Sequence, residues 1–288
     1  MKAIAAALAA AALAVAAGLA ATASGAAPPD RVAFVASSYD RIVLLSRSGE
    51  GLRTFGRGES PAFSADASRI AFIRDNDVWV MGSDGTGLTR ITRTQAIEES
   101  PDWSPDGTLV YASNRSSSFT LWLQKPGSPA RRLTRVAKQW QEDRSPQWSP
   151  DGRSIAFASN RAGFFNQELY LIAPDGSGLR RLTRTPGSDD VLGDDGMPAW
   201  RPDGSGLVFV SNRDRNLELY SLDLGSGRAT RLTRTPGVSE TLPRVTPEGR
   251  YVFVVPVGTS GSSRLSVMNA QLRGRTALQA GAAIDPRP

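Results

Sequence analysis

The side chains of this chain that could carry out acid–base chemistry are carboxylates. No His and no Cys occur among the 288 residues, which excludes a Ser-His-Asp triad, a cysteine nucleophile and a histidine-ligated zinc or manganese site. Two carboxylates at a suitable separation can hydrolyse a glycosidic bond, and Asp143, Asp195 and Glu240 each stand three residues before a proline. A carboxylate-dependent glycoside hydrolase or lyase is therefore the enzymatic alternative, although such regular placement favours a structural role.

Motifs for other chemistry are missing from the sequence. It contains no GxSxG elbow, no P-loop and no GxGxxG, so we expect no nucleotide chemistry and no cofactor. Its 34 Lys and Arg against 28 Asp and Glu leave a net charge of +6. No basic block is interleaved with aromatic residues, so we expect no nucleic-acid partner. We expect a monomer.

The acids recur because the chain is built from a repeat. Copies start at Pro61, Pro101, Pro146, Pro198 and Pro243. In the clearest copy, residues 146–184, four short apolar runs are separated by turn residues, which predicts four antiparallel strands. In the turn Pro150-Asp151-Gly152, Pro presets φ, Asp caps the turn and Gly accepts a positive φ. These turn acids are therefore interpreted as structural.

The number of copies predicts the fold. The second apolar run of the unit occurs six times and the first only five times, because a partial first copy spans residues 31–60. The C-terminal tail, residues 282–286, resembles the missing run. We therefore predict an all-β, six-bladed β-propeller of four-stranded antiparallel blades over residues 29–288, with the ring closed by the C-terminal tail. An open β-solenoid of the same units is the alternative, but it gives the tail no role.

The first residues of the chain are typical of a secretory signal peptide. Lys2 precedes an apolar run over residues 3–20, and Ala21-Thr22-Ala23 has the small-x-small form of a cleavage site. We assign residues 1–23 to the signal peptide, with an uncleaved membrane anchor as the alternative. Without a cysteine the exported protein forms no disulfide and carries no lipid on cysteine. The expected location is the periplasm or the extracellular space, without stable membrane insertion once the leader is cleaved.

Propeller connectivity brings two charged sets to one face, here called the loop face. It is formed by the loops between the second and third strands and by the loops that enter each blade. The former carry Arg74, Arg115, Arg161 and Arg213. The latter carry Glu59, Glu98 or Glu99, Asp143, Asp195 and Glu240. One interpretation is a ring of Arg–carboxylate pairs that tie the blades together. The other is that some of these groups bind an extended peptide or a charged ligand.

Two irregular loops on the same face carry further candidates. Trp140 lies among polar residues, either as an exposed binding anchor or packed on the neighbouring loop. The segment 185–197 carries Asp189, Asp190, Asp194 and Asp195, which could bind calcium, although their spacing matches no defined calcium loop. We assign no metal site, and a small-ligand or cation-binding propeller remains a further alternative.

The repeat resembles that of a known family. The string S-P-x-W-S-P-D-G, followed by I-A-F-x-S-N-R, x-L-Y-L, D-G-S-G and R-L-T, is similar to the TolB-type propeller repeat. It is clear in the copies at 101, 146 and 198, and degenerate in those at 61 and 243. The resemblance implies an exported propeller with a central channel that binds proteins or peptides at the cell envelope. TolB has an additional N-terminal α/β domain, which we expect this chain to lack.

Together these observations predict a non-catalytic binding platform for a protein or peptide of the cell envelope. The candidate binding residues on the loop face are Arg74, Arg115, Arg161, Arg213, Trp140, Asp143, Asp195 and Glu240.

Overall fold

The computed structural model is an all-β protein, and no helix occurs among the residues that it describes. These are residues 15–16, 31–36, 41–46, 53–164, 166–185, 195–235, 237, 239–245, 249, 251–257, 262–268 and 275–277. Their strands form four-stranded sheets with strictly antiparallel pairing, and there are six such sheets. Within the described residues, no helix is long and apolar enough to cross a membrane.

The first three sheets are formed by strands that follow one another in the chain. The first contains β1 (Val15–Ala16), β2 (Arg31–Ala36), β3 (Arg41–Ser46) and β4 (Arg53–Arg57). The second contains β5 (Glu59–Phe63), β6 (Arg69–Arg74), β7 (Asp77–Gly82) and β8 (Thr89–Arg90). The third contains β9 (Glu98–Trp103), β10 (Leu109–Ser113), β11 (Thr120–Gln124) and β12 (Arg131–Arg132).

The remaining sheets repeat this order. The fourth contains β13 (Asp143–Trp148), β14 (Ile155–Ser159), β15 (Glu168–Ile172) and β16 (Arg180–Arg181). The fifth contains β17 (Asp195–Trp200), β18 (Gly206–Ser211), β19 (Glu218–Asp223) and β20 (Ala229–Arg231). The sixth contains β21 (Thr241–Val245), β22 (Tyr251–Val257), β23 (Ser262–Met268) and β24 (Arg275–Ala277).

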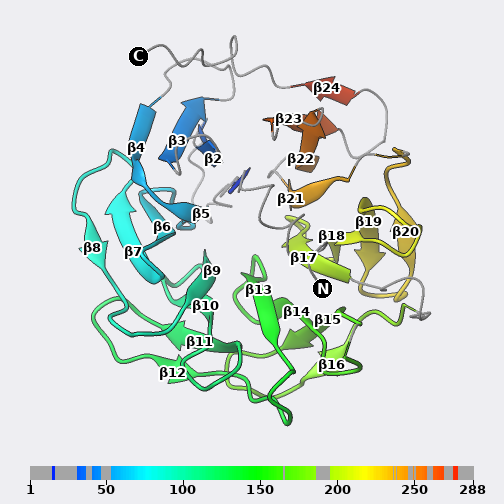
Figure 1. The fold of residues 1–288 in the computed structure, drawn as a ribbon, viewed down its shortest axis with the longest axis horizontal. Helices are drawn as coiled ribbons and strands as arrows, with labels where there is room; N and C mark the ends of the chain where they lie inside the picture. Colours follow the sequence, from blue (N-terminus) through cyan, green and yellow to red (C-terminus); the bar gives the residue numbers. More distant parts are fainter. Residues whose placement is uncertain are drawn as a thin grey trace.

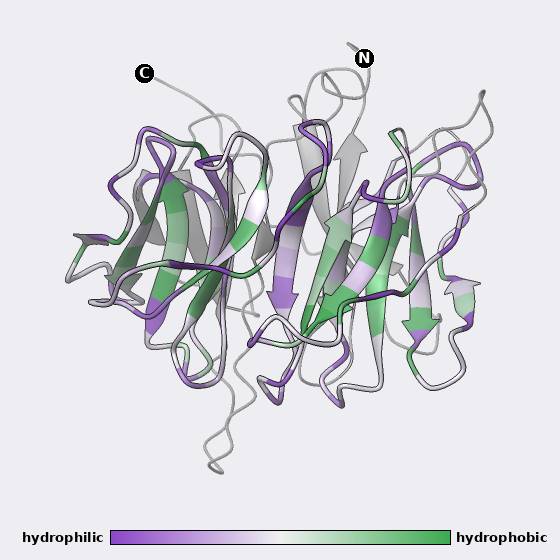
Figure 2. Ribbon diagram, turned by 90° about the horizontal axis from the view of Figure 1, so that it is seen from below, coloured by the Kyte–Doolittle hydropathy of each residue, from purple (hydrophilic) through white to green (hydrophobic). Residues whose placement is uncertain are grey.

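The sheets stand around a common axis (Figure 1), with the first strand of each unit innermost and the fourth outermost. The inner strands β5, β9, β13, β17 and β21 contact one another in chain order. Seen from the side, apolar residues lie along the strands and polar residues gather in the loops at both edges (Figure 2). This arrangement places the loops that enter each sheet at one end of the axis and the Pro-Asp-Gly turns at the other.

The second strand of each sheet is apolar on both faces because each face contributes to a different core. Ile155 and Phe157 of β14 pack in a cluster with the third sheet, whereas Ala156 and Ala158 pack in a cluster with the fifth. Side chains alternate across a strand, so one strand supplies both interfaces of its sheet. All four residues are buried.

The turn acids have the structural role that the sequence predicts. The Ser149 hydroxyl donates to Asp151 Oδ1 at 2.6 Å, and Gly152, at a φ of 68°, donates its N–H to the Ser149 carbonyl at 2.9 Å. The bond from Ser149 is the largest influence on Asp151 and holds its pKa below the usual value. Stabilising the ionised carboxylate therefore stabilises the turn itself.

One expectation about the first sheet stays a prediction. We expected the C-terminal tail to supply its inner strand, and residues 278–288 lie outside the described residues. The described inner neighbour of β2 is β1, which pairs Val15 with Phe34 and also contacts β5 and β21. In the full chain an apolar segment of the expected leader is thus available to the open edge of β2, whose backbone groups need partners. The remainder of the expected leader lies outside the described residues.

Candidate binding site at the central channel

A bulge in each inner strand shapes the channel. In five sheets, a non-glycine residue directly before the strand's proline has a positive φ, between 48° and 54°. These residues are Ser60, Ser100, Ser145, Met197 and Leu242. The register shifts at the same point in every one of these strands. Proline cannot donate to a strand ladder, so the strand bulges there and turns these residues toward the axis.

The bulges enclose a small central cavity of about 50 Å³. Five inner strands line it, with three serines, a glutamine and an arginine among prolines and apolar residues. The lining residues are Ser60, Pro61, Ser100, Pro101, Ser145, Gln147, Met197, Pro198, Leu242 and Arg244. Because no two sheets alone could form it, the cavity exists only when the sheets surround the axis.

Asp102 of β9 is a carboxylate that directly follows Pro101, a residue of the cavity wall. Its Oδ2 accepts a hydrogen bond at 2.8 Å from the backbone N–H of Trp148, which belongs to the next sheet. Burial raises the pKa of Asp102 to about 6, although the Trp148 N–H and the charge of Arg244 act in the opposite direction. Removal of water from the carboxylate therefore outweighs these favourable interactions.

Arg244 of β21 brings a positive charge to the same channel. Its Nη1 donates to the Pro243 carbonyl at 3.0 Å. Burial lowers the pKa of Arg244, and Asp102 acts on it electrostatically in the opposite direction. Among the described residues, no carboxylate forms a contact ion pair with Arg244. Asp102 and Arg244 were not among the residues that we predicted. The sequence contained one signal that could have identified them. The residue after the strand's proline is charged only in these two copies of the unit and is Ala or Gln in the other three.

Three of the predicted arginines bind the predicted acids. Arg161 Nη2 lies 2.7 Å from both carboxylate oxygens of Asp143. Arg213 binds Asp195 in the same way at 2.9 and 2.7 Å, and Arg115 Nη2 donates to Glu98 at 2.7 Å. These acids are fully buried or nearly so. Each pair joins the inner strand and the loop of a single sheet, so the expectation that these pairs tie neighbouring blades together is wrong.

The geometry explains why the pairs are internal. The arginine follows the second strand, and its Nε donates to the serine that ends that strand, as from Arg161 to Ser159 at 3.1 Å. That serine stands opposite the acid in the ladder, as Ser159 stands opposite Asp143. The guanidinium therefore closes onto the carboxylate beside it. Both carboxylate oxygens of Asp143 are occupied, which leaves this acid poorly suited to proton transfer.

One ion pair between sheets comes from an arginine that we did not predict. Arg144 contacts Glu99 of the preceding sheet through Nη1 and donates from Nε to Glu142 at 2.9 Å. Its guanidinium also lies over the ring of Phe119 at 3.6 Å from the centroid. Arg144 follows directly after the predicted acid Asp143, so adjacent residues have opposite roles: one closes its own sheet and the next joins two sheets.

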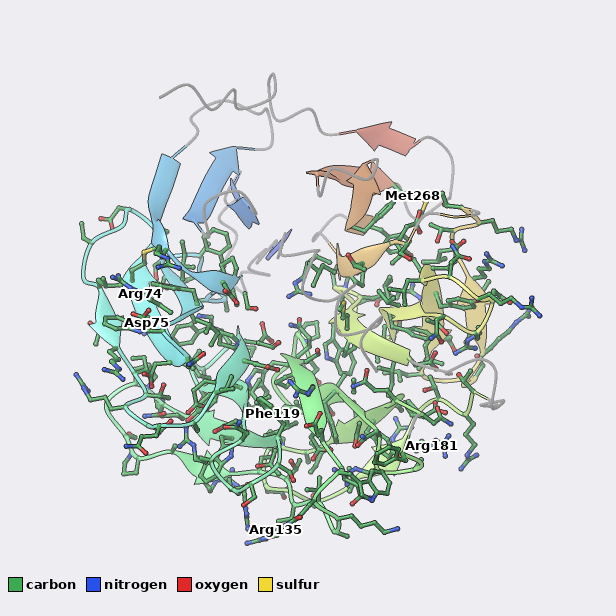
Figure 3. All side chains as sticks on the ribbon, in the orientation of Figure 1. Arg74, Asp75, Phe119, Arg135, Arg181 and Met268 are labelled. Carbon is green, nitrogen blue, oxygen red and sulfur yellow. The ribbon has the colours of Figure 1, made fainter. Side chains whose placement is uncertain are left out.

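Arg74 does not belong to this pattern. A two-residue turn, Asp75-Asn76, joins β6 to β7 with φ values of 50° and 64°. Arg74 Nε lies 3.6 Å from Asp75, which is exposed, and its guanidinium lies over the ring of Trp79. Figure 3 shows Arg74 and Asp75 together at the side of the second sheet. The shorter loop removes the Ser-Asn-Arg sequence that positions the other arginines.

Glu240 is the buried acid of the sixth sheet. The Thr235 hydroxyl donates to Glu240 Oε1 at 2.9 Å, and the side chain is fully buried. The corresponding loop after β22, residues 258–261, lies outside the described residues. The position of Glu240 nevertheless matches that of the other inner-strand acids, and its burial is again that of a structural group.

Trp140 packs against a neighbouring loop and still reaches the surface. Its ring meets Phe164 edge to face, with centroids 5.1 Å apart, and the Lys138 ammonium lies 5.3 Å from its centroid. Asn160 Nδ2 donates to the Trp140 carbonyl at 3.0 Å and fixes the loop. Phe164 is 50% exposed. The two aromatic rings thus form an apolar patch on the loop face, which we call the aromatic patch.

The calcium alternative finds no support in the part of the chain that is described. Asp189, Asp190 and Asp194 lie outside it. Asp195 accepts hydrogen bonds from Arg213 and, at 2.8 Å, from the Thr185 hydroxyl. No cluster of three acidic side chains that could hold a metal ion occurs among the residues with described positions.

A second repeated network lies toward the outside of the sheets. Arg181 Nη2 donates to the buried Glu168 at 2.5 Å, and the Thr183 hydroxyl contacts the same carboxylate. The same three-part arrangement occurs in two other sheets, as Asp77 with Arg90 and Thr92, and Glu218 with Arg231 and Thr233. This network accounts for the recurring Arg-Leu-Thr and Arg-Ile-Thr strings. The Arg and Thr of each string bind a buried acid of the third strand and so attach the outermost strand to the sheet.

Comparison with known proteins agrees with this architecture. The family model described as the TolB beta propeller domain matches residues 120–288. A TolB homolog of Chlorobium luteolum is 27% identical over 202 residues, 64% of this chain and 44% of that protein. The Tol-Pal system protein TolB of Bordetella pertussis is 31% identical over 169 residues, 57% of this chain and 36% of that protein.

Among solved structures, TolB from Acinetobacter baumannii superimposes with a TM-score of 0.71 and 22% identity, over 86% of this chain and 64% of that one. The chain spans less than half the length of the relatives from Chlorobium luteolum and Bordetella pertussis. The match of the family model extends over more than half of the chain and includes the fourth, fifth and sixth sheets, so this chain belongs to the TolB beta propeller domain family.

Proposed function

We propose that this protein is an exported, non-catalytic propeller that binds a protein or peptide of the cell envelope at its loop face. The observation that carries the proposal is a contrast on that face. The regularly placed acids are buried and bound by arginine or threonine, whereas the aromatic patch of Trp140 and Phe164 is accessible. Rigid aromatic rings on a fixed loop are typical anchors of protein interfaces.

The family supports the location. Relatives include proteins described as Tol-Pal system protein TolB, and a propeller of this family with a signal peptide would act outside the cytoplasm. We propose cleavage after Ala23 and function as a monomer in the periplasm or the extracellular space. Mass spectrometry of the protein recovered from its native host should give a mature N-terminus at Ser24. A retained Met1 or Lys2 would refute cleavage and favour the anchor.

We also propose that the six sheets form the blades of a closed ring. Once the leader is removed, β1 is no longer present to pair with β2, and the C-terminal tail can take its place. The mature protein should then lose stability in urea when residues 278–288 are deleted, since a closed propeller has no open end. An unchanged midpoint would show that the tail does not close the ring.

The binding proposal is tested by cross-linking from envelope extracts. A photoreactive residue at Lys138, beside the aromatic patch, should capture one recurrent protein from the native host. The double variant Trp140→Ala, Phe164→Ala should lose that product. The matched control is Leu179→Ala, which removes an exposed apolar side chain (45% exposed) from a turn at the opposite end of the axis. Capture that is unchanged by the double variant, in a folded protein, would refute the loop-face assignment.

A further inference from the structure

Arg244 places a positive charge at the central cavity, where burial disfavours the charged form of its side chain. It lines the central cavity, and burial lowers its pKa. A guanidinium offers several N–H donors in one plane, and one contact, to the Pro243 carbonyl, is present. No carboxylate among the described residues is in ion-pair contact with it. A partly buried arginine that lines a cavity and has spare donors is suited to bind an incoming anion.

The protein's own nearby carboxylate does not substitute for that anion. Asp102 is engaged with the Trp148 backbone N–H of the neighbouring sheet, and it acts on Arg244 through space rather than by contact. Burial also favours its neutral form. The channel therefore holds a guanidinium that has no carboxylate in contact with it among the described residues, although Asp102 acts on it from a distance.

The cavity walls and size restrict the anion. Ser60, Ser100 and Ser145 line one side, whereas Met197 and Leu242 line the other together with Arg244. A volume of about 50 Å³ is far below that of pockets that hold whole drug-sized ligands, several hundred Å³. Only a small end group can be admitted. Planar carboxylates match the geometry of a guanidinium, and an apolar neighbour would face Met197 and Leu242.

The direction of entry follows from the strand order. In β9, β13 and β17, which begin with a buried acid at the loop face, the bulge lies two residues further along the strand, as Ser145 does from Asp143. The cavity is therefore nearer to the loop face than to the Pro-Asp-Gly turns. A ligand bound at the aromatic patch could extend its end into the channel.

We propose that Arg244 binds the terminal carboxylate of a peptide chain that enters the channel from the loop face, with its last side chain against Met197 and Leu242. This inference rests on the proposed function and identifies the part of the partner that is recognised. Small free carboxylates have the same chemistry, and the experiment separates the two sources.

The test uses the full mature protein and a pool of randomised hexapeptides carrying a fluorophore at the N-terminus. One pool ends in a free carboxylate and the other in an amide, and binding is followed by fluorescence polarisation. The free-acid pool should bind more tightly than the amide pool by about 10- to 100-fold, the effect of losing a charge-assisted pair. Arg244→Gln should remove that difference, and Arg244→Lys should restore part of it.

The control variant is Arg201→Gln, which removes a partly exposed arginine next to the turn acid Asp203 and should leave both pools unaffected. Sodium acetate is the probe for the second source. If acetate alone stabilises the wild type against heat but not Arg244→Gln, and peptides bind no better than acetate, the peptide assignment is overturned. Equal binding of acid and amide pools, or an unaffected Arg244→Gln, overturns the role of Arg244.

These outcomes are distinct from failure of the proposed function. If envelope cross-linking at the aromatic patch succeeds while binding is independent of the terminal carboxylate, only the role of Arg244 is lost. If the double aromatic variant still captures the partner, the loop-face proposal falls, and acid-specific peptide binding would then show that the channel acts alone.

Discussion

Replacing Asp102 with Asn should stabilise the folded protein at neutral pH and have little effect in acid. The carboxyl group of Asp102 has a pKa of about 6 in the folded state, against a usual value of 3.8. The folded protein thus holds the proton more tightly than the unfolded chain does. The stabilising contribution is complete below pH 3.8 and is lost as the pH rises to about 6.

The magnitude follows from the two pKa values. Each pKa unit corresponds to about 1.4 kcal/mol, so the ionised carboxylate costs the folded state up to about 3 kcal/mol above pH 6. Asn is uncharged at every pH, and its side-chain oxygen can still accept the hydrogen bond from the Trp148 backbone N–H. The variant should therefore gain up to about 3 kcal/mol in unfolding free energy at pH 8. Water that screens the charge of Asp102 reduces this gain.

Urea unfolding followed by tryptophan fluorescence at pH 4 and pH 8 measures this difference. Asp151→Asn is the matched control with the opposite sign, because the Ser149 hydroxyl holds the pKa of Asp151 below its usual value. That variant should lose stability at pH 8 and lose less at pH 4. An Asp102→Asn variant no more stable than the wild type at pH 8, or equally stabilised at both pH values, would refute the desolvation argument.

Three further predictions concern stability and are read from urea midpoints at pH 7.5. Arg161→Met should lower the free energy of unfolding by about 3–5 kcal/mol, because the fully buried Asp143 loses both hydrogen bonds to its carboxylate. The double variant with Asp143→Asn should recover most of this loss, and no recovery would disprove the pairing. Arg74→Gln should change the free energy of unfolding by less than about 0.5 kcal/mol, because its partner Asp75 is exposed. A larger loss would contradict the view that this surface pair contributes little to stability. Gly152→Ala should cost about 1–2 kcal/mol, because φ is 68° and the new Cβ would lie 3.2 Å from Pro105; a neutral effect would contradict the turn geometry.

The sequence predicted the positions of the charged residues better than it predicted which arginine binds which acid. The sequence indicates that Arg115, Arg161 and Arg213 meet acids at one face, but not that each arginine would close onto its own sheet. That choice depends on the serine that ends the second strand and stands beside the acid in the ladder. Arg74 occupies a similar place in its unit, but the turn between its strands is shorter, and it does not pair with an inner-strand acid as the other three arginines do.

By itself, the sequence determined the local structure of this protein. Alternating apolar positions, the Pro-Asp-Gly turns and the recurrence of the unit predict four-stranded sheets and their order, because hydrogen bonding and burial within one unit depend on residues close together in the chain. The family follows from the same repeat.

Only the tertiary structure decided which side chains meet around the axis. Asp102 and Arg244 come from the third and sixth sheets and affect each other only because the inner strands of these sheets surround the same axis. Arg144 joins two sheets and β1 takes the inner position of the first sheet for the same kind of reason. Electrostatic energy depends on distance and on the loss of water, and both are set by the arrangement of the sheets rather than by the spacing of residues within any one of them.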